Sequence, residues 1–355
     1  MQILERRIDR AHRPYLIAEM SGNHNQSLDR ALAIVDAAAH AGADAIKLQT
    51  YTADTMTLAI DHPDFRIEDP DSLWHGRSLH ELYDEAHTPW AWHAPILERA
   101  RKQGLACFST PFDASAVDFL ESLDIPAYKI ASFECTDLAL IRRVARTGKP
   151  LILSTGMATL AEIDATVRCA REAGAGPLVL LKCTSSYPAS PVHSNVRTLE
   201  ALRTAFGCEV GLSDHTLGCG AAIAAVALGA TVIEKHFTLS RAEGGVDAAF
   251  SMEPTEFALL RAETERAWQA LGEVQFGGNA SEAGSRVFKR SLYVVEDLKA
   301  GETLSTRNLR AIRPGHGLPP ACLDTLIGLR VARDVARGTP MHWSLLKPDA
   351  AHLPE

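Results

Sequence analysis

Short apolar runs that end in polar residues recur eight times along the chain. Each run predicts a buried parallel strand, and the strands are expected at 15–19, 45–49, 106–110, 128–132, 151–154, 178–182, 210–213 and 232–236. Segments with helical spacing separate them, at 29–41, 89–103, 114–123, 137–147 and 255–271 among others. Eight such repeats predict an α/β fold of the (β/α)8 TIM-barrel type, with the polar residues gathered at one rim.

The pattern changes after the last helical segment. A stretch rich in Gly, Asn and Ser follows at 272–284, and beyond it come only short strand-like runs at 291–295 and 309–312. We therefore expect a barrel domain at 1–275, a linker at 276–288 and a small turn-rich module at 289–355. Because its strands are short, the module is expected to have little core and to pack on a partner subunit.

Composition limits the class of protein. The 355 residues are 46% hydrophobic and 23% charged, with a net charge of −8 and no long block of one sign, which argues against a nucleic-acid surface. No apolar run approaches the roughly 18 residues of a membrane span, and no signal-peptide core follows the N-terminus. Seven cysteines without CxxC spacing favour the reduced cytoplasm. Neither GxGxxG nor a P-loop motif occurs, which argues against NAD or ATP chemistry.

Two histidines stand at the ends of neighbouring predicted strands, His215 in GLSDHT and His236 in VIEKHF. Imidazoles placed side by side at the rim suit a divalent metal, and two ligands leave positions open for a substrate oxygen. The alternative is that each only hydrogen-bonds within the rim.

Cations and hydroxyls end several other strands. Lys47 and Lys129 follow apolar residues that would bury their stems, and a lone lysine of this kind is usually a surface residue. Two lysines at one rim, surrounded by hydroxyls, predict an anion cradle for phosphate or carboxylate; the hydroxyls are Thr110, Ser132, Ser154, Ser185 and Ser213. Lys182 and Lys235 are weaker candidates, because neighbouring side chains on a strand point to opposite faces.

Two carboxylates complete the candidates that the pattern itself provides. Glu19 ends the first strand and Glu134 follows the fourth. Both could handle protons or bind a hydroxyl, or they could simply pair with the lysines.

A series of motifs in one order resembles the sialic acid synthase family of phosphoenolpyruvate-condensing enzymes. The motifs are ADAIKLQTYTADTMTL, FSTPFD, YKIASFE, STGMA, KCTSSYPA, GLSDHT, VIEKHFTL and GGVDAAFS. The tail RSLYVVEDLKAGETLSTRNLRAIRPGHGL resembles the antifreeze-like (SAF) domain of that family. Within the family the motifs are most similar to the branch that uses 2,4-diacetamido-2,4,6-trideoxy-L-altrose. The N-acetylneuraminate branch typically carries Asn where this chain has Ser185.

The resemblance implies a reaction and residue roles. A divalent ion, Mn²⁺ or Mg²⁺, would be held by His215 and His236. Lys47, Lys129 and the five hydroxyl residues named above match positions that hold phosphoenolpyruvate. Five residues match positions around the metal water and the sugar: Glu19, Gln49, Glu134, Tyr187 and Asp247. Arg313 matches an arginine that the SAF domain contributes to the neighbouring subunit, which implies a domain-swapped homodimer.

Other functions stay open from the sequence. Synthases of legionaminic or N-acetylneuraminic acid share the same motifs and differ in the sugar that they accept. A carbohydrate-binding protein with an inactive barrel is a second possibility, although the histidines and lysines of the motifs are all present. A metal-dependent aldolase that uses pyruvate is a third, and it would release no phosphate.

Overall fold

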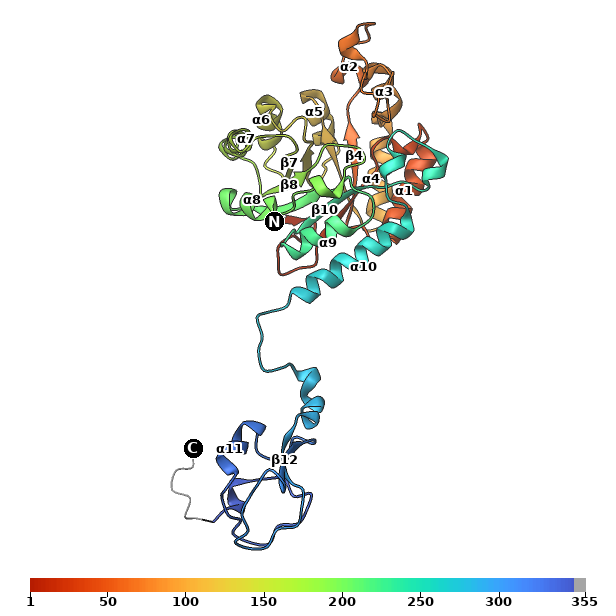
Figure 1. The fold of residues 1–355 in the computed structure, drawn as a ribbon. Coiled ribbons are helices and arrows are strands. Elements are labelled where there is room, and N and C mark those ends of the chain that lie inside the picture. The colour runs from red at the N-terminus through yellow and green to blue at the C-terminus, as the bar shows by residue number, and fades with distance from the viewer. Residues whose placement is uncertain (348–355) are drawn as a thin grey trace. The chain divides into compact units, whose positions relative to one another are not determined.

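A computed structural model describes residues 1–347, which form two compact units, Met1–Gly272 and the segment from Glu273 onward (Figure 1). The first unit is a closed barrel of eight parallel strands in the order β10-β3-β4-β5-β6-β7-β8-β9, which confirms the TIM-barrel prediction. The strands are β3 (Tyr15–Glu19), β4 (Ala45–Thr50), β5 (Ala106–Pro111), β6 (Tyr128–Ile130), β7 (Leu151–Ser154), β8 (Leu178–Cys183), β9 (Glu209–Ser213) and β10 (Val232–His236). The predicted fourth strand, 128–132, is two residues too long.

Helices surround the strands in Figure 1 and bury their outer faces, which is why the strands are apolar along most of their length. The helices of this unit are α1 (Leu28–His40), α2 (Ala53–Met56), α3 (Leu79–Ala86), α4 (His93–Lys102), α5 (Ala114–Ser122), α6 (Leu138–Ala145), α7 (Leu160–Glu172), α8 (Thr198–Phe206), α9 (Gly220–Ala227) and α10 (Pro254–Leu271). Short 3-10 turns lie between them, including η1 (Ser21–His24), η4 (Pro191–His193) and η6 (Ala248–Phe250). None of the helices within residues 1–347 is long and apolar enough to cross a membrane.

Polar residues at the helix ends fix where these helices begin. Asp137 accepts hydrogen bonds from the first amides of α6, and Asp113 does the same for α5. Thr159 and Glu162 form a capping box at the start of α7. Helix α8 ends at Gly207, whose φ of 58° is a left-handed conformation that favours glycine.

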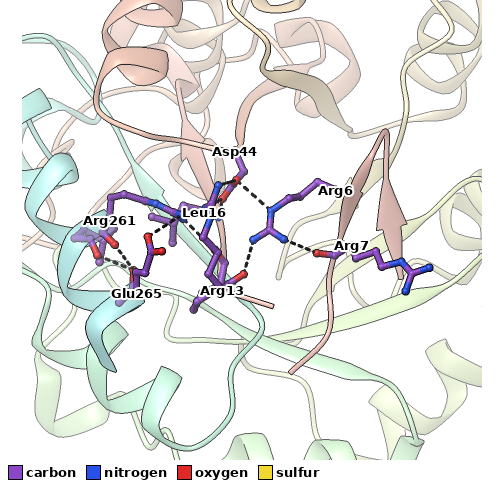
Figure 2. A network of polar contacts seen from close by, with 10 residues as sticks. Arg6, Arg7, Arg13, Leu16, Asp44, Arg261 and Glu265 are labelled. Carbon is purple, nitrogen blue, oxygen red and sulfur yellow. Dashed lines mark hydrogen bonds and ion pairs between the residues drawn. The ribbon is translucent and has the colours of Figure 1, made fainter. Parts of the chain in front are cut away.

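An N-terminal hairpin that the pattern did not predict lies at the amino-terminal ends of the strands. It consists of β1 (Gln2–Ile3) and β2 (Arg6–Arg7). Asp44, just before β4, holds this end together, as Figure 2 shows. Its carboxylate lies 3.5 Å from Arg6 Nε and 3.0 Å from Arg13 Nη2, and it accepts the Leu16 amide at 2.9 Å. Arg261 of α10 reaches the same carboxylate at 3.4 Å.

The second unit has a small apolar core of its own. Strands β11 (Ser291–Val294) and β12 (Leu309–Ile312) pair antiparallel and are followed by α11 (Leu323–Leu326). Eleven buried apolar residues form the core, among them Leu292, Leu309 and Met341. The expected linker, 276–288, is not wholly irregular, because a 3-10 helix, η7 (Ala280–Phe288), occupies most of it. Residues 348–355 of the expected module lie outside the described part.

Candidate active site

The carboxyl-terminal ends of the barrel strands bring four charged side chains into one buried cluster. Lys47 of β4 lies 2.6 Å from Glu19 of β3, and Lys129 of β6 lies 2.9 Å from Glu234 of β10. The two pairs are joined because Lys47 Nζ is also 3.7 Å from Glu234 Oε1. All four side chains are at most 5% exposed. Two ammonium groups and two carboxylates thus balance in charge where water is excluded.

Burial and charge pull the pKa values of this cluster in different directions. Burial disfavours charge on Glu234, but Lys129 and Lys47 outweigh it and lower the pKa of Glu234 to about 2. Burial raises the pKa of Glu19, with Lys47 opposing and Glu234 adding to the rise. Burial likewise lowers the pKa of Lys129. The two carboxylates of the cluster therefore shift in opposite directions: the pKa of Glu234 is lowered and that of Glu19 is raised.

Two of the expected hydroxyl groups contact the lysine–carboxylate cluster. Lys47 Nζ donates to Thr110 Oγ1 at 3.2 Å, and Ser213 Oγ donates to Glu234 Oε1 at 3.1 Å. Ser154 Oγ is buried and has no hydrogen-bond partner in the described part of the chain. Ser132 and Ser185 converge on Gly156, where a Cβ would lie 2.6 Å and 3.0 Å from their oxygens. These groups can donate hydrogen bonds to an anion.

The two histidines are neighbours, with ring centroids 5.3 Å apart. His215 Nδ1 lies 2.9 Å from the Thr184 carbonyl, which favours the tautomer that leaves Nε2 free to ligate. His236 Nδ1 is buried without a hydrogen-bond partner and lies 3.7 Å from Asp247 Oδ2. Burial lowers the pKa of His236 well below its usual value, and His215 adds to this. A neutral imidazole with an open nitrogen is the form that binds a metal.

No larger cluster of metal ligands accompanies them. Across residues 1–347, no group of three or more His, Cys, Asp and Glu side chains has an arrangement that could hold a metal ion. Two open imidazole nitrogens fit a divalent ion only if water or substrate supplies the other ligands.

Two further carboxylates face the same region. Burial raises the pKa of Glu134 to about 7, and one of its oxygens is buried without a hydrogen-bond donor. Burial also raises the pKa of Asp247, which accepts a hydrogen bond from Ser21. A carboxyl group with a pKa near neutrality can both take up and release a proton.

An aromatic group stands beside the histidines. The Tyr187 ring lies 4.4 Å from His215 and 5.2 Å from Phe250, between ring centroids. Phe250 is 4.9 Å from His236, and Trp74 is 6.0 Å from Tyr187. The long connection after β4, which carries Trp74, thus reaches the rim. Its indole donates to the Val246 carbonyl at 2.9 Å.

The structure brings together most of the residues expected from the sequence. Gln49 shares the inner face of β4 with Lys47 and pairs in register with Thr110. Lys182 and Lys235 do not join the cluster. Lys182 bonds to Cys183 O and Thr184 Oγ1, and Lys235 to Asp214 and two loop carbonyls. Arg313 is exposed after β12 in the second unit.

Three residues of the site were missed by the sequence reasoning. Glu234 could have been found, because it stands two positions before His236 and alternation puts both on one face of β10. Ser21 and Phe250 lie in turns outside the strands, and no periodic signal marks them.

Each of the two units matches the model of a known family. The model of the NeuB family matches residues 34–276, and that of the SAF domain matches residues 289–347.

Individual relatives match over nearly the whole chain. A pseudaminic acid synthase of Campylobacter jejuni is 44% identical over 91% of this chain and 94% of its own length. One of Helicobacter pylori is 41% identical over 92% and 96%. Among solved structures, an N-acetylneuraminic acid synthetase of Leptospira borgpetersenii in complex with citrate has a TM-score of 0.69 and 32% identity, over 77% of this chain and 90% of that one.

Proposed function

Because the chain belongs to the NeuB family, we propose that it is an enzyme that makes pseudaminic acid. It would condense phosphoenolpyruvate with 2,4-diacetamido-2,4,6-trideoxy-L-altrose and water, and release phosphate. The observation that carries this choice is the 41–44% identity with pseudaminic acid synthases over more than nine-tenths of the chain. The buried cluster of Lys47, Lys129 and hydroxyls supports the use of an anionic substrate.

Phosphoenolpyruvate would bind where the lysines and hydroxyls converge. Lys47 and Lys129 supply positive charge in a dry site, where Coulomb attraction is strong. The unpartnered hydroxyl of Ser154, together with Thr110, Ser132, Ser185 and Ser213, supplies directional donors to carboxylate and phosphate oxygens. Glu234 would hold the two ammonium groups in place while the anion binds, because it contacts both of them.

His215 and His236 are the residues that would hold the divalent metal, Mn²⁺ or Mg²⁺. When bound, such an ion polarises the aldehyde oxygen of the open-chain sugar. The residues fit this role because the hydrogen bond of His215 Nδ1 leaves Nε2 free, and because His236 Nδ1 has no partner.

The bond changes define what the carboxyl groups must do. C3 of phosphoenolpyruvate forms a bond to the aldehyde carbon, whose oxygen takes up a proton and becomes a hydroxyl. Water then adds to C2 and gives up a proton, and the C–O bond to phosphate breaks. Glu19, Glu134 and Asp247 suit these proton transfers, since burial raises the pKa of each.

The aromatic group beside the histidines supports a 6-deoxy sugar. Trp74, Tyr187 and Phe250 form an apolar wall near His215 and His236, against which a C6 methyl group would pack. A hydroxyl at C6 would lose hydrogen bonds to water on that wall. Gln49 would instead bind a polar group of the sugar. Synthesis of legionaminic or N-acetylneuraminic acid is the alternative.

A homodimer would complete the site. Large apolar residues are exposed after four neighbouring strands, β6 to β9: Phe133, Met157, Leu160, Val192 and Leu217. Several large exposed apolar residues at one rim favour coverage by protein. We expect the second unit of a partner subunit to cover it and to bring its Arg313 to the sugar in a domain-swapped arrangement. A cytoplasmic location is also expected, since all seven cysteines are free thiols.

Phosphate release tests the proposal. The enzyme, phosphoenolpyruvate and Mn²⁺ are combined with the trideoxy-altrose, with the legionaminic acid precursor or with N-acetylmannosamine, each with and without EDTA. We expect metal-dependent release with the trideoxy-altrose alone. Preference for another sugar would overturn the specificity, and no release with any sugar would overturn the chemistry.

A further inference from the structure

We propose that a hollow at the amino-terminal end of the barrel binds a small anion that also carries hydroxyl groups, such as a phosphorylated or carboxylated sugar. The hollow has a volume of about 500 Å³ and lies where β8 and β9 begin, at Leu178 and Glu209. The active-site residues lie beyond the opposite ends of the same strands. The volume is in the range of small-molecule sites.

Three arginines line the hollow: Arg10, Arg171 and Arg203. In the described part of the chain, no carboxylate oxygen lies within 4.0 Å of any of the three guanidinium groups. Arg10 and Arg203 are also close together, because a Cβ on Gly229 would lie 3.4 Å from Arg10 Nε and 3.0 Å from Arg203 Nη2. Adjacent like charges repel one another, and an anion from solution would offset this cost.

Two residues that line the hollow each have a buried polar atom without a hydrogen-bond partner among the described residues, Arg203 Nε and Glu209 Oε2. Arg171 and Arg203 each use one nitrogen on a backbone carbonyl, of Phe206 and Gly229, both at 2.5 Å. That structural role leaves the other N–H groups unused. The arginines would receive the anionic group, and Glu209 would accept a hydrogen bond from a hydroxyl. Inorganic phosphate has fewer hydroxyl groups than a sugar with which to donate a hydrogen bond to Glu209.

A second hollow provides a comparison within the same molecule. It also has a volume of about 500 Å³ and is lined by three arginines and one glutamate: Arg142, Arg146, Arg168 and Glu172. There, however, Arg168 pairs with Asp164 at 2.9 Å, and none of the lining residues has a buried unpartnered polar atom in the described structure. Basic lining alone therefore does not distinguish the first hollow; its unsatisfied groups do.

Cys208 gives a local readout, because it lines the first hollow and is partly exposed. The rate at which iodoacetamide alkylates Cys208 is measured by peptide mass spectrometry in the full-length protein. The probes are inorganic phosphate, glucose 6-phosphate and N-acetylneuraminic acid. At about ten times its Kd, a bound sugar should slow alkylation about tenfold by mass action. Arg10→Gln and Glu209→Gln should weaken this protection, and Arg146→Gln in the second hollow should not.

Arg10 is the variant of choice because its side chain makes no hydrogen bond or ion pair in the described structure, so folding should survive its loss; thermal unfolding checks this. Equal protection in wild type and Arg10→Gln, or none from any probe, would overturn the proposal. Equal protection by phosphate and by both sugars would overturn the role of Glu209. The test reads Cys208 and not turnover, so its result does not depend on the proposed enzyme activity.

Discussion

Charged groups are buried at both ends of the barrel, but they are satisfied to different degrees. At the amino-terminal end, the Asp44 carboxylate accepts from the Leu16 amide and faces Arg6, Arg13 and Arg261 (Figure 2). At the carboxyl-terminal end, several buried polar atoms have no hydrogen-bond partner in the described part of the chain. They belong to Glu19, Glu134, Ser154, Glu234 and His236.

The difference separates a structural charge from a functional one. Asp44 ties the N-terminal hairpin, β3 and α10 to one point, so nothing further can bind there without displacing a contact. An unsatisfied buried donor or acceptor costs about 1–3 kcal/mol, so several of them close together call for an explanation, and a bound ligand is one. The unsatisfied atoms at the carboxyl-terminal end lie beside the two neighbouring histidines and the buried lysines, and we assign the chemistry to that end.

The largest expected effect is on catalysis, from Lys129→Met. The loss of a positive charge aimed at the bound anion should reduce kcat/KM for phosphate release about a thousandfold. Lys182→Met is the matched control, because that lysine lies on β8 and bonds only to Cys183 O and Thr184 Oγ1. Equal losses in the two variants would show that the buried cluster does not hold the anion.

At the amino-terminal end of the barrel, a substitution should change the stability of the fold. Asp44→Ala leaves the Leu16 amide and three guanidinium groups without their shared acceptor, which should lower the free energy of unfolding by about 3 kcal/mol. Urea denaturation measures this. Turnover per folded molecule should stay unchanged, since the substitution is remote from the candidate site. A loss of turnover at full folding would mean that the two ends are coupled, contrary to the comparison above.

Glu134 should control how kcat/KM depends on pH at the carboxyl-terminal end of the barrel. Burial raises its pKa from 4.5 to about 7, so the carboxylate forms as pH rises through about 7. If it accepts a proton, kcat/KM should rise over that interval and then level off. Glu134→Gln should remove the inflection and lower kcat/KM about a hundredfold.

The same shift predicts a stability change of known sign. The folded pKa of Glu134 lies above its unfolded value, so its contribution to stability is full below about pH 4.5 and is lost as pH rises through about 7. Glu134→Gln should flatten this part of the pH–stability curve. An inflection that persists in the variant would assign the titration to another group.

Strand periodicity explains both what the sequence predicted and what it did not. All eight barrel strands and the rim residues that end them follow from the apolar runs, because a strand in a parallel barrel is buried on both faces. Alternation also separates Lys235, bonded to Asp214 behind β10, from Glu234 and His236 at the site. The hairpin of β1 and β2 could not be predicted because its two strands are only two residues long each, too short for a periodic signal. Ser21 and Phe250 lie in turns, where no periodic signal marks them.

The smallest expected effect is on the free energy of unfolding, at the edge of the amino-terminal network. Glu265 pairs with Arg261 at 3.2 Å across one turn of α10, at the edge of the Asp44 network (Figure 2). Its side chain is 37% exposed, so water already screens the pair, and Glu265→Gln should lower the free energy of unfolding by less than about 0.5 kcal/mol. Urea denaturation beside Asp44→Ala measures the ratio of the two effects. Because both carboxylates face Arg261, a loss as large as that of Asp44 would mean that the network acts as one unit and not through the buried aspartate.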